Sequence, residues 1–256
     1  MPTPLPRPRD PDTLLSSGLE VIERAYTDYG RGRMLPLFSG GHDSYCAVYV
    51  ASQSPYFDGR VYHINTGIGS CRTRAFVEQV CKEEGWKLVV LKNPRASYED
   101  IVRHYGFPGP SIHPVCYRKL KGQCLRDLTR RTSRYSPRAH YFPISGVRRK
   151  ESDRRLQTRA IRVGDAMRGD STSDMHLIWV SPCYDWSTRE QIDFMNAFAL
   201  LRNPVKDSVL GMSGECFCGA FARPYELDMI REVCPDVAVE IDRLAAIAET
   251  ASKPSN

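Results

Sequence analysis

The sequence predicts an α/β fold in which helices flank a parallel sheet. Short apolar segments typical of buried strands alternate with segments of helical periodicity along most of the chain. A turn of two glycines joins the first of these strands to the helix after it, and the 256 residues are enough to bury a sizeable core. Since alternating strands and helices pair in parallel through right-handed crossovers, we expect one layered α/β domain with short appendages.

The first 32 residues predict an arm and a helix. Residues 1–12 carry five prolines and little apolar material, so we expect an extended segment. Asp12 or Thr13 is suited to cap a helix with apolar residues between 14 and 26, and Gly30 is suited to end it.

Residues 33–200 predict the central domain. Strands are expected at 33–38, 60–65, 86–91, 139–145 and 176–180. Helices are expected at 43–53, 72–84, 97–105, 114–131 and 187–201. The last of these begins with Ser187 and Glu190 at the spacing of a capping box.

Residues 201–256 predict a cysteine-bearing loop and a helical C-terminal extension packed on the central domain. The segment 204–219 has no regular pattern and contains Cys216 and Cys218, and helices are expected at 225–233 and 237–248.

The segment Ser39-Gly40-Gly41-His42-Asp43-Ser44 is the strongest functional signal in the chain. Glycines let the backbone approach a ligand closely, and the free amides and dipole of a helix N-terminus favour an anion. No Gly-Lys-Ser/Thr follows the glycines, so the pattern differs from the phosphate loop of Walker-type nucleotidases. The sequence therefore predicts a phosphate-binding loop of another type.

This segment resembles the PP-loop, SGGxDS, of the ATP pyrophosphatase superfamily, whose members cleave ATP between the α and β phosphates. The resemblance implies an adenine nucleotide alpha-hydrolase-like fold with ATP as the bound nucleotide. It also implies Mg²⁺ bridging the phosphates, with Asp43 as a direct or water-mediated partner.

Further segments resemble the phosphoadenosine phosphosulfate (PAPS) reductase family of this superfamily, over most of residues 33–220. They are Asn65-Thr66-Gly67 in place of the family's Asp-Thr-Gly, Thr73, Gly146 to Ser152, and Ser181 to Ser187. The resemblance implies a nucleotide site formed by Ser39, Gly40, Gly41, Asp43, Ser44, Asn65, Thr66, Gly67, Gly146, Arg148 and Ser152. Asp43, Arg148 and Arg149 are the implied catalytic residues, the arginines neutralising the departing pyrophosphate.

Two departures from the true reductases favour a different reaction. The loop is intact, whereas reductases carry a degenerate one, and the C-terminal Glu-Cys-Gly-Leu-His segment with the reductase nucleophile is absent. Both indicate ATP-dependent sulfur transfer through an adenylated intermediate, as in DNA phosphorothioation and tRNA thiolation. The alternatives are a sulfonucleotide reductase that releases sulfite and, from another class, a non-catalytic iron–sulfur sensor that binds nucleic acid.

The nine cysteines favour metal or redox chemistry over disulfides. Cys216-Phe217-Cys218 resembles the family's Cys-x-x-Cys with one residue fewer, Cys116 lies where the family places its other ligands, and Cys183 ends a strand. We expect Cys116, Cys183, Cys216 and Cys218 to bind a 4Fe–4S cluster. Cys124 is the alternative to Cys183. Zinc on the same ligands and a metal-free thiol pair are the alternatives to the cluster.

Charge and composition define the expected partners. The net charge is +6, and the basic residues concentrate between 118 and 138 and between 148 and 162, which favours contact with phosphates or a nucleic-acid backbone. No apolar run approaches the ~20 residues that cross a bilayer, and the N-terminus does not resemble a signal peptide. We expect a cytoplasmic homo-oligomer. Its expected partners are an adenine nucleotide, a nucleic-acid substrate and a sulfur-donor protein, and we expect no binding to a membrane.

Overall fold

The computed structural model describes residues 8–133, 140–151, 153–164, 177–223 and 225–251. The chain divides into two compact units. Unit 1 comprises Met1–Leu37, His42–Arg60 and Ala139–Leu201, and unit 2 comprises Phe38–Gly41, Val61–Arg138 and Arg202–Asn256. The predicted nucleotide-binding domain, residues 33–200, therefore contributes to both units.

Unit 1 contains a four-stranded sheet and its helices. In chain order its elements are α1 (Pro11–Tyr29), β1 (Gly32–Pro36), α2 (His42–Ser52), β4 (His140–Ile144), the 3-10 turn η2 (Arg149–Glu151), α7 (Asp153–Leu156), β5 (Ile161–Val163), β6 (Ile178–Val180) and α8 (Thr188–Ala197).

The sheet of unit 1 has the strand order β1-β4-β6-β5. β1 is parallel to β4, with Gly32 opposite His140 and Pro36 opposite Ile144, and β4 is parallel to β6. The expected parallel strands are thus present. The edge strand β5 is antiparallel to β6 and was not predicted, because three residues give too short a pattern to identify.

Helix α1 corrects the predicted cap. Asp10, and neither Asp12 nor Thr13, is the N-cap residue, and its Oδ1 accepts a hydrogen bond from the Thr13 backbone N at 2.9 Å. Pro11 occupies the first helical position, where a missing N–H costs nothing, so the cap lies one residue before it.

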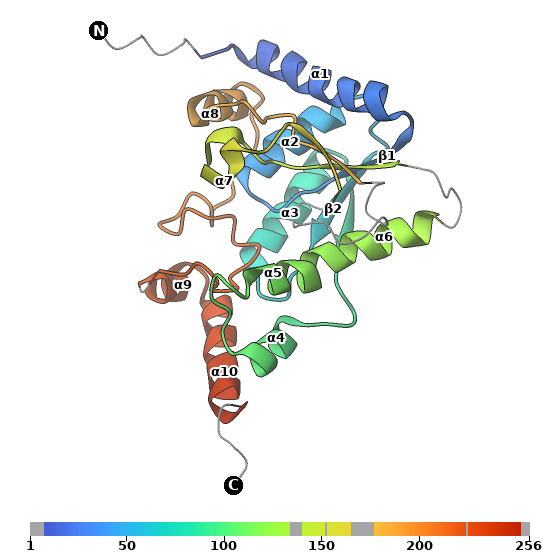
Figure 1. The fold of residues 1–256 in the computed structure, drawn as a ribbon. Helices are drawn as coiled ribbons and strands as arrows, with labels where there is room; N and C mark the ends of the chain where they lie inside the picture. The colour runs from blue at the N-terminus through green and yellow to red at the C-terminus, as the bar shows by residue number, and fades with distance from the viewer. Residues whose placement is uncertain (1–7, 134–139, 152, 165–176, 224, 252–256) are drawn as a thin grey trace. The chain divides into compact units, whose positions relative to one another are not determined.

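Three helices cover the sheet of unit 1. α1, α2 and α8 pack on one another, and α2 also packs on β1 and β4 (Figure 1). Tyr26 of α1 stacks on Phe142 of β4 with ring centroids 4.1 Å apart, and Trp186 packs on Phe194 of α8 at 4.7 Å. These contacts join α1 to the sheet and the segment before α8 to that helix.

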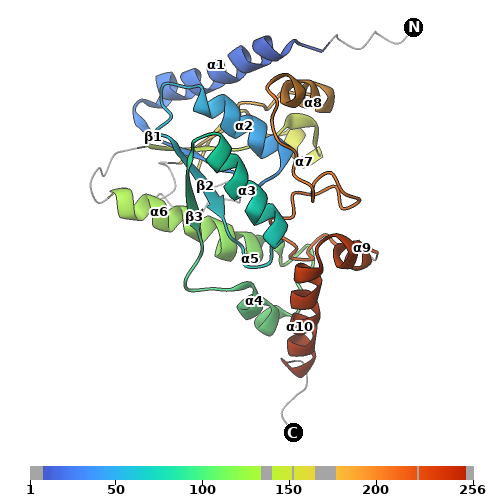
Figure 2. The same cartoon turned by 180° about the vertical axis from the view of Figure 1, so that it is seen from behind.

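Unit 2 contains a strand pair and a larger set of helices. Its elements are β2 (Arg60–Ile64), α3 (Cys71–Glu83), β3 (Lys87–Leu91), α4 (Tyr98–Tyr105), α5 (His113–Cys116), the π-helix η1 (Tyr117–Gly122), α6 (Gln123–Ser133), α9 (Glu226–Val233) and α10 (Pro235–Ala251). β2 pairs with β3, and α3 lies beside them (Figure 2).

The helix expected at 114–131 is three consecutive helical segments, of which the middle one is a π-helix. The core of unit 2 joins α4, α5, η1, α9 and α10 to the loop around 217 through buried residues that include Ile101, Cys116, Leu120, Phe217 and Leu244. No helix within the described ranges is long and apolar enough to cross a membrane.

Candidate nucleotide-binding site

The glycine turn that follows β1 is held by long-range hydrogen bonds within unit 2. Gly40 has φ +80°, a conformation that favours glycine. Its carbonyl accepts a hydrogen bond from Asn203 Nδ2 at 2.8 Å, and the same amide donates to the carbonyl of Ser213 at 3.0 Å. Asn203 is fully buried, so one amide group fixes the turn against a segment more than 150 residues later in the chain.

The space around the turn excludes larger residues. A Cβ on Gly40 would lie 2.8 Å from Thr73 Cγ2, and a Cβ on Gly41 would lie 3.2 Å from Ser213 Cβ. Thr73 donates through Oγ1 to the Ser213 carbonyl at 2.7 Å. Gly40 is therefore favoured on both conformational and steric grounds, whereas a side chain at position 41 would require Ser213 to shift.

Asp43 lies in the first turn of α2, in unit 1. Its Oδ1 accepts hydrogen bonds from Arg148 Nε and from Gln191 Nε2, the latter at 2.6 Å. No hydrogen bond to the second carboxylate oxygen, Oδ2, occurs within the described residues, and 24% of the side chain is exposed. One oxygen is thus anchored and the other is available to a ligand.

Arg148 is a buried cation held by several acceptors. Only 7% of the residue is exposed. Besides Asp43, its guanidinium donates through Nη1 to the Trp186 carbonyl at 3.4 Å and to Thr188 Oγ1 at 3.3 Å. A buried guanidinium fixed in this way presents a preorganised positive charge beside the carboxylate.

Gly146 permits the approach of the 146–151 segment to α2. A Cβ on Gly146 would lie 2.4 Å from the carbonyl carbon of Asp43 and 2.4 Å from the backbone N of Ser44. Both atoms are backbone, so no side-chain rotation would relieve the clash. The two predicted segments, 39–44 and 146–152, thus meet in unit 1 at Asp43 and Ser44.

Arg149 differs from Arg148 in its surroundings. Its backbone N donates to the Tyr184 carbonyl at 2.7 Å, but its side chain is 54% exposed and lies 3.9 Å from Asp185. Nearby, Arg155 forms an ion pair with Glu151, and burial is the main cause that lowers the pKa of Arg155. Ser152 lies outside the described residues.

The predicted segment Asn65-Thr66-Gly67 follows β2 in unit 2. Asn65 Oδ1 accepts a hydrogen bond from the Gly67 backbone N at 2.9 Å, which closes a tight turn. Thr66 is buried and donates through Oγ1 to the Glu215 carbonyl at 2.9 Å. Thr66 therefore ties the strand end to the cysteine-bearing loop.

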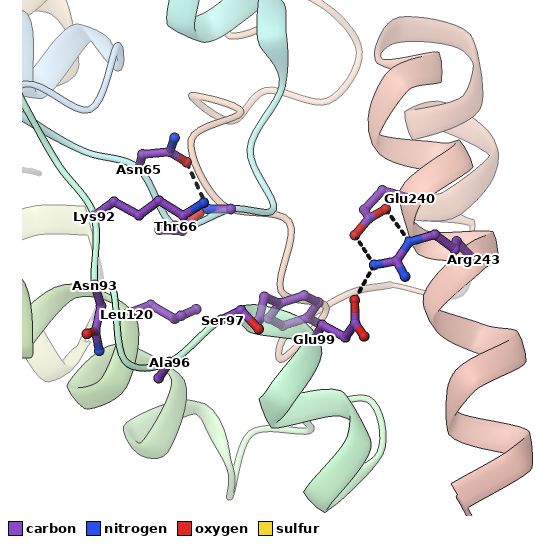
Figure 3. A pocket seen from close by; sticks show the side chains of 12 residues that line it. Asn65, Thr66, Lys92, Asn93, Ala96, Ser97, Glu99, Leu120, Glu240 and Arg243 are labelled. Carbon is purple, nitrogen blue, oxygen red and sulfur yellow. Dashed lines mark hydrogen bonds and ion pairs between the residues drawn. The ribbon is translucent and has the colours of Figure 1, made fainter.

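These residues line a cavity of about 140 Å³ (Figure 3). The ends of β2 and β3 supply Asn65 to Gly67, Lys92 and Asn93, while α4 and its preceding residues, Leu120, and α10 supply the rest. The cavity lies within unit 2.

Three of the four predicted cysteine ligands belong to one buried cluster in unit 2. Cys116 and Cys218 are buried, and Cys216 packs against the same cluster. The neighbouring Cys216 thiol is the main cause that lowers the pKa of Cys218 to about 5, and His113 lowers it further. The interaction with Cys218 is the main cause that raises the pKa of Cys216, and burial raises it further.

Cys183, the fourth predicted ligand, lies in unit 1, where it is buried and its pKa is raised by burial. The alternative ligand, Cys124, is buried in unit 2 and its thiol donates to the Leu120 carbonyl at 3.2 Å. The four remaining cysteines lie in segments of helical pattern, which predicts core positions for Cys46, Cys71, Cys81 and Cys234. Three of them are buried, but the prediction is wrong for Cys71, which is exposed at the first position of α3. No group of three or more His, Cys, Asp or Glu side chains in the part of the chain that the structure describes is arranged to hold a metal ion.

The sequence did not indicate four residues that shape these sites: Asn203, Ser213, Thr188 and Gln191. Asn203, Ser213 and Gln191 are far in sequence from the groups they contact, so no local pattern marks them. Thr188 follows the capping residue Ser187, and this proximity is the only signal that could have found it.

Comparison with known proteins agrees with this architecture. The phosphoadenosine phosphosulfate reductase domain family matches residues 33–207, which is more than half of the chain. No match was found among curated protein sequences.

Two solved structures share the fold. Phosphoadenylyl-sulfate reductase from Candida auris, in a phosphate complex, is 16% identical, with 77% of this chain and 89% of that chain covered and a TM-score of 0.50. NH3-dependent NAD synthetase from Campylobacter jejuni, in complex with nitrate, is 10% identical, with 97% and 98% covered and a TM-score of 0.50. The two structures share the fold, and the family match over residues 33–207 shows that the chain belongs to the phosphoadenosine phosphosulfate reductase domain family.

Proposed function

We propose that the protein is an enzyme that activates an acceptor with ATP and then transfers sulfur to it. The observation that carries this proposal is the complete SGGxDS segment, whose Asp43 is bonded to the buried Arg148 and to Gln191. An intact phosphate loop with a fixed carboxylate and a fixed cation suits a triphosphate better than a nucleotide that is already sulfated.

Within unit 2, the backbone of Ser39 to Gly41 would hold phosphate oxygens, since the two glycines leave no side chain between the backbone and a ligand. Within unit 1, Asp43 and Ser44 at the start of α2 would do the same beside Arg148. The oxygen Oδ2 of Asp43 has the chemistry that Mg²⁺ prefers, so this residue would hold the metal. Mg²⁺ would supply charge neutralisation on the phosphates.

The proposed reaction has two displacements. An acceptor oxygen attacks the α-phosphorus of ATP, the bond from that phosphorus to the bridging oxygen breaks, and pyrophosphate leaves with the electron pair. Arg148 and Arg149 stabilise the charge that develops on it. A sulfur nucleophile at the oxidation level of sulfide, supplied by a donor protein, then displaces AMP from the activated acceptor. The oxidation state of the sulfur does not change.

We further propose an iron–sulfur cluster on Cys116, Cys216 and Cys218 of unit 2. Thiol sulfur is the donor that such clusters require, and the three thiols share one buried cluster in unit 2. Within the described residues these thiols do not form a group arranged to hold a metal ion. The proposed reaction therefore does not pass through the cluster.

The test of the proposed function is the conversion of ATP to AMP and pyrophosphate in the presence of candidate acceptors, followed by phosphorus NMR. Gly41→Val should abolish ATP binding measured by calorimetry, because the side chain meets Ser213. Gly109→Val is the matched control, since no atom lies within 4 Å of a Cβ there. Sulfite release from an adenylyl sulfate would instead identify a reductase, and ATP binding without turnover would identify a sensor.

A further inference from the structure

The cavity in unit 2 carries an unneutralised cation at one end. Lys92 lies directly after β3 and lines the cavity. Among the residues that the structure describes, none forms a hydrogen bond or an ion pair with its ammonium group. A cation without a counter-charge at the wall of a cavity attracts an anionic group.

Asn65 lies at the same end of the cavity as Lys92 (Figure 3). Its Oδ1 is occupied by the Gly67 backbone N, so the group that it can still offer is the Nδ2 donor. A carboxylate at this position would neutralise Lys92, whereas the amide leaves the ammonium charge unbalanced. This end of the cavity thus presents only donors from these two side chains.

The acidic side chains of the cavity lie at its other end and are already paired. Arg243 donates to Glu99 and to Glu240, at 2.7 Å in both cases (Figure 3). Glu99 also accepts from Arg103, and the bonds from Arg243 and Arg103 lower the pKa of Glu99. These carboxylates are therefore matched to Arg243 and Arg103, and Lys92 is the charged side chain of the lining that has no such partner among the described residues.

The cavity is bordered by the first basic stretch. Asn93, which lines the cavity, donates through Nδ2 to the carbonyl of Lys119 at 2.7 Å, so the backbone of this stretch comes close to the cavity within unit 2. Arg118 is exposed. A nucleic-acid backbone that places one phosphate at Lys92 would extend toward this basic stretch, where further positive charges attract its phosphates.

The size of the cavity sets the size of its occupant. A volume of about 140 Å³ is below the ~300–1,000 Å³ of pockets that enclose a whole drug-sized ligand. It suits a single group of a larger molecule. We propose that Lys92 and Asn65 Nδ2 bind a phosphate group of a nucleic-acid acceptor. This inference rests on the proposed function, because it assigns the acceptor of that reaction.

The test measures binding of fluorescein-labelled single-stranded DNA and RNA by anisotropy over a range of salt concentrations. Lys92→Gln should weaken binding about tenfold at low salt and reduce the salt slope by about 1. Asn65→Asp should weaken binding at least as much, since it places a carboxylate beside the ammonium. Lys87→Gln removes the same charge from an exposed site on the same strand and should leave binding unchanged.

Calorimetry with ATP separates this inference from the proposed function. Both Lys92→Gln and Lys87→Gln should keep the ATP affinity of the wild type, because neither position belongs to the phosphate loop. Oligonucleotide binding that is equal in Lys92→Gln and the wild type overturns the inference while ATP binding stands. Inorganic phosphate that binds in a Lys92-dependent manner, with no binding of oligonucleotides, also overturns it, since the site then takes a free anion and not an acceptor.

Discussion

Gln191 of α8 donates a hydrogen bond through Nε2 to Asp43 Oδ1 of α2 at 2.6 Å. The two residues are 148 positions apart, and Gln191 is only 5% exposed. The amide therefore fixes the carboxylate of the phosphate loop in one orientation, so that Oδ2 faces away from the hydrogen-bonded side.

Gln191→Leu keeps the approximate size of the side chain and removes this donor. Because a partner that orients a metal-binding carboxylate affects affinity by about 10- to 100-fold, we expect the Mg²⁺ concentration for half-maximal ATP cleavage to rise by at least tenfold. Titration of activity with Mg²⁺ measures this shift. Gln79→Leu, which removes a surface contact with Glu83 on α3, should not change the titration. An unchanged Mg²⁺ dependence in Gln191→Leu would show that Arg148 alone orients Asp43.

Gly146→Ala should displace the start of α2. The new methyl group would lie 2.4 Å from backbone atoms of Asp43 and Ser44, so the segment must move, and we expect ATP affinity to fall by more than tenfold. Calorimetry with ATP checks this result, and thermal unfolding reports the accompanying loss of stability. Gly122→Ala is the control, because the nearest atom to its added Cβ is 3.8 Å away. Wild-type affinity in Gly146→Ala would contradict the proposed role of the 146–151 segment.

Glu190 should make the protein sensitive to acid. Burial raises the pKa of this carboxyl, but hydrogen bonds from Arg9 and from Ser187 outweigh burial and lower the pKa to about 2, from an ordinary value of 4.5. A lowered pKa stabilises the fold fully above pH 4.5, and this contribution is lost as the pH falls toward 2.

Glu190→Gln should therefore lower the free energy of unfolding at pH 7 by about 3 kcal/mol at most. The difference from the wild type should shrink between pH 4.5 and pH 2. Urea unfolding followed by circular dichroism at several pH values measures both. Glu20→Gln, at an exposed position of α1, should give the wild-type profile. A difference that does not change with pH would exclude the carboxylate as the cause.

The iron–sulfur proposal predicts a brown protein after purification without oxygen. Cys116→Ser, Cys216→Ser and Cys218→Ser should each lose the visible absorption and the iron, whereas Cys46→Ser should keep both. Cys183→Ser and Cys124→Ser decide the fourth ligand, since only one of them should lose iron. Zinc, or no metal, in the wild-type protein would contradict the cluster.

The local parts of the fold were predictable from the sequence. The strand–glycine–helix pattern at 33–53 depends on neighbouring residues, and β1 and α2 lie there with boundaries shifted by one or two residues. The caps at Ser97 and Ser187 follow equally local rules, and both capping boxes are present. By contrast, β5 has only three residues, and its antiparallel pairing with β6 depends on the sheet.

The sites were predictable only in their sequence motifs. The glycines at 40, 41 and 146 were identified by pattern, but the atoms that make them necessary belong to Thr73, Ser213 and Asp43. Similarly, Asn203 contacts the loop over 163 positions, which no spacing rule anticipates. Such long-range hydrogen bonds are set by tertiary packing, so they appear only when the chain is folded.

The π-helical turn η1 determines the relative orientation of two helix faces. It lies between Cys116 of α5 and Cys124 of α6, and its hydrogen bonds span five residues instead of four. If Tyr117–Gly122 wound as α-helix with the same number of residues, each residue would turn further about the axis, and α6 would be rotated by about 100° relative to α5. Leu125 and Cys124 would then leave the core together. The face that α6 turns toward the core therefore depends on how this short segment winds as well as on which residues of α6 are apolar.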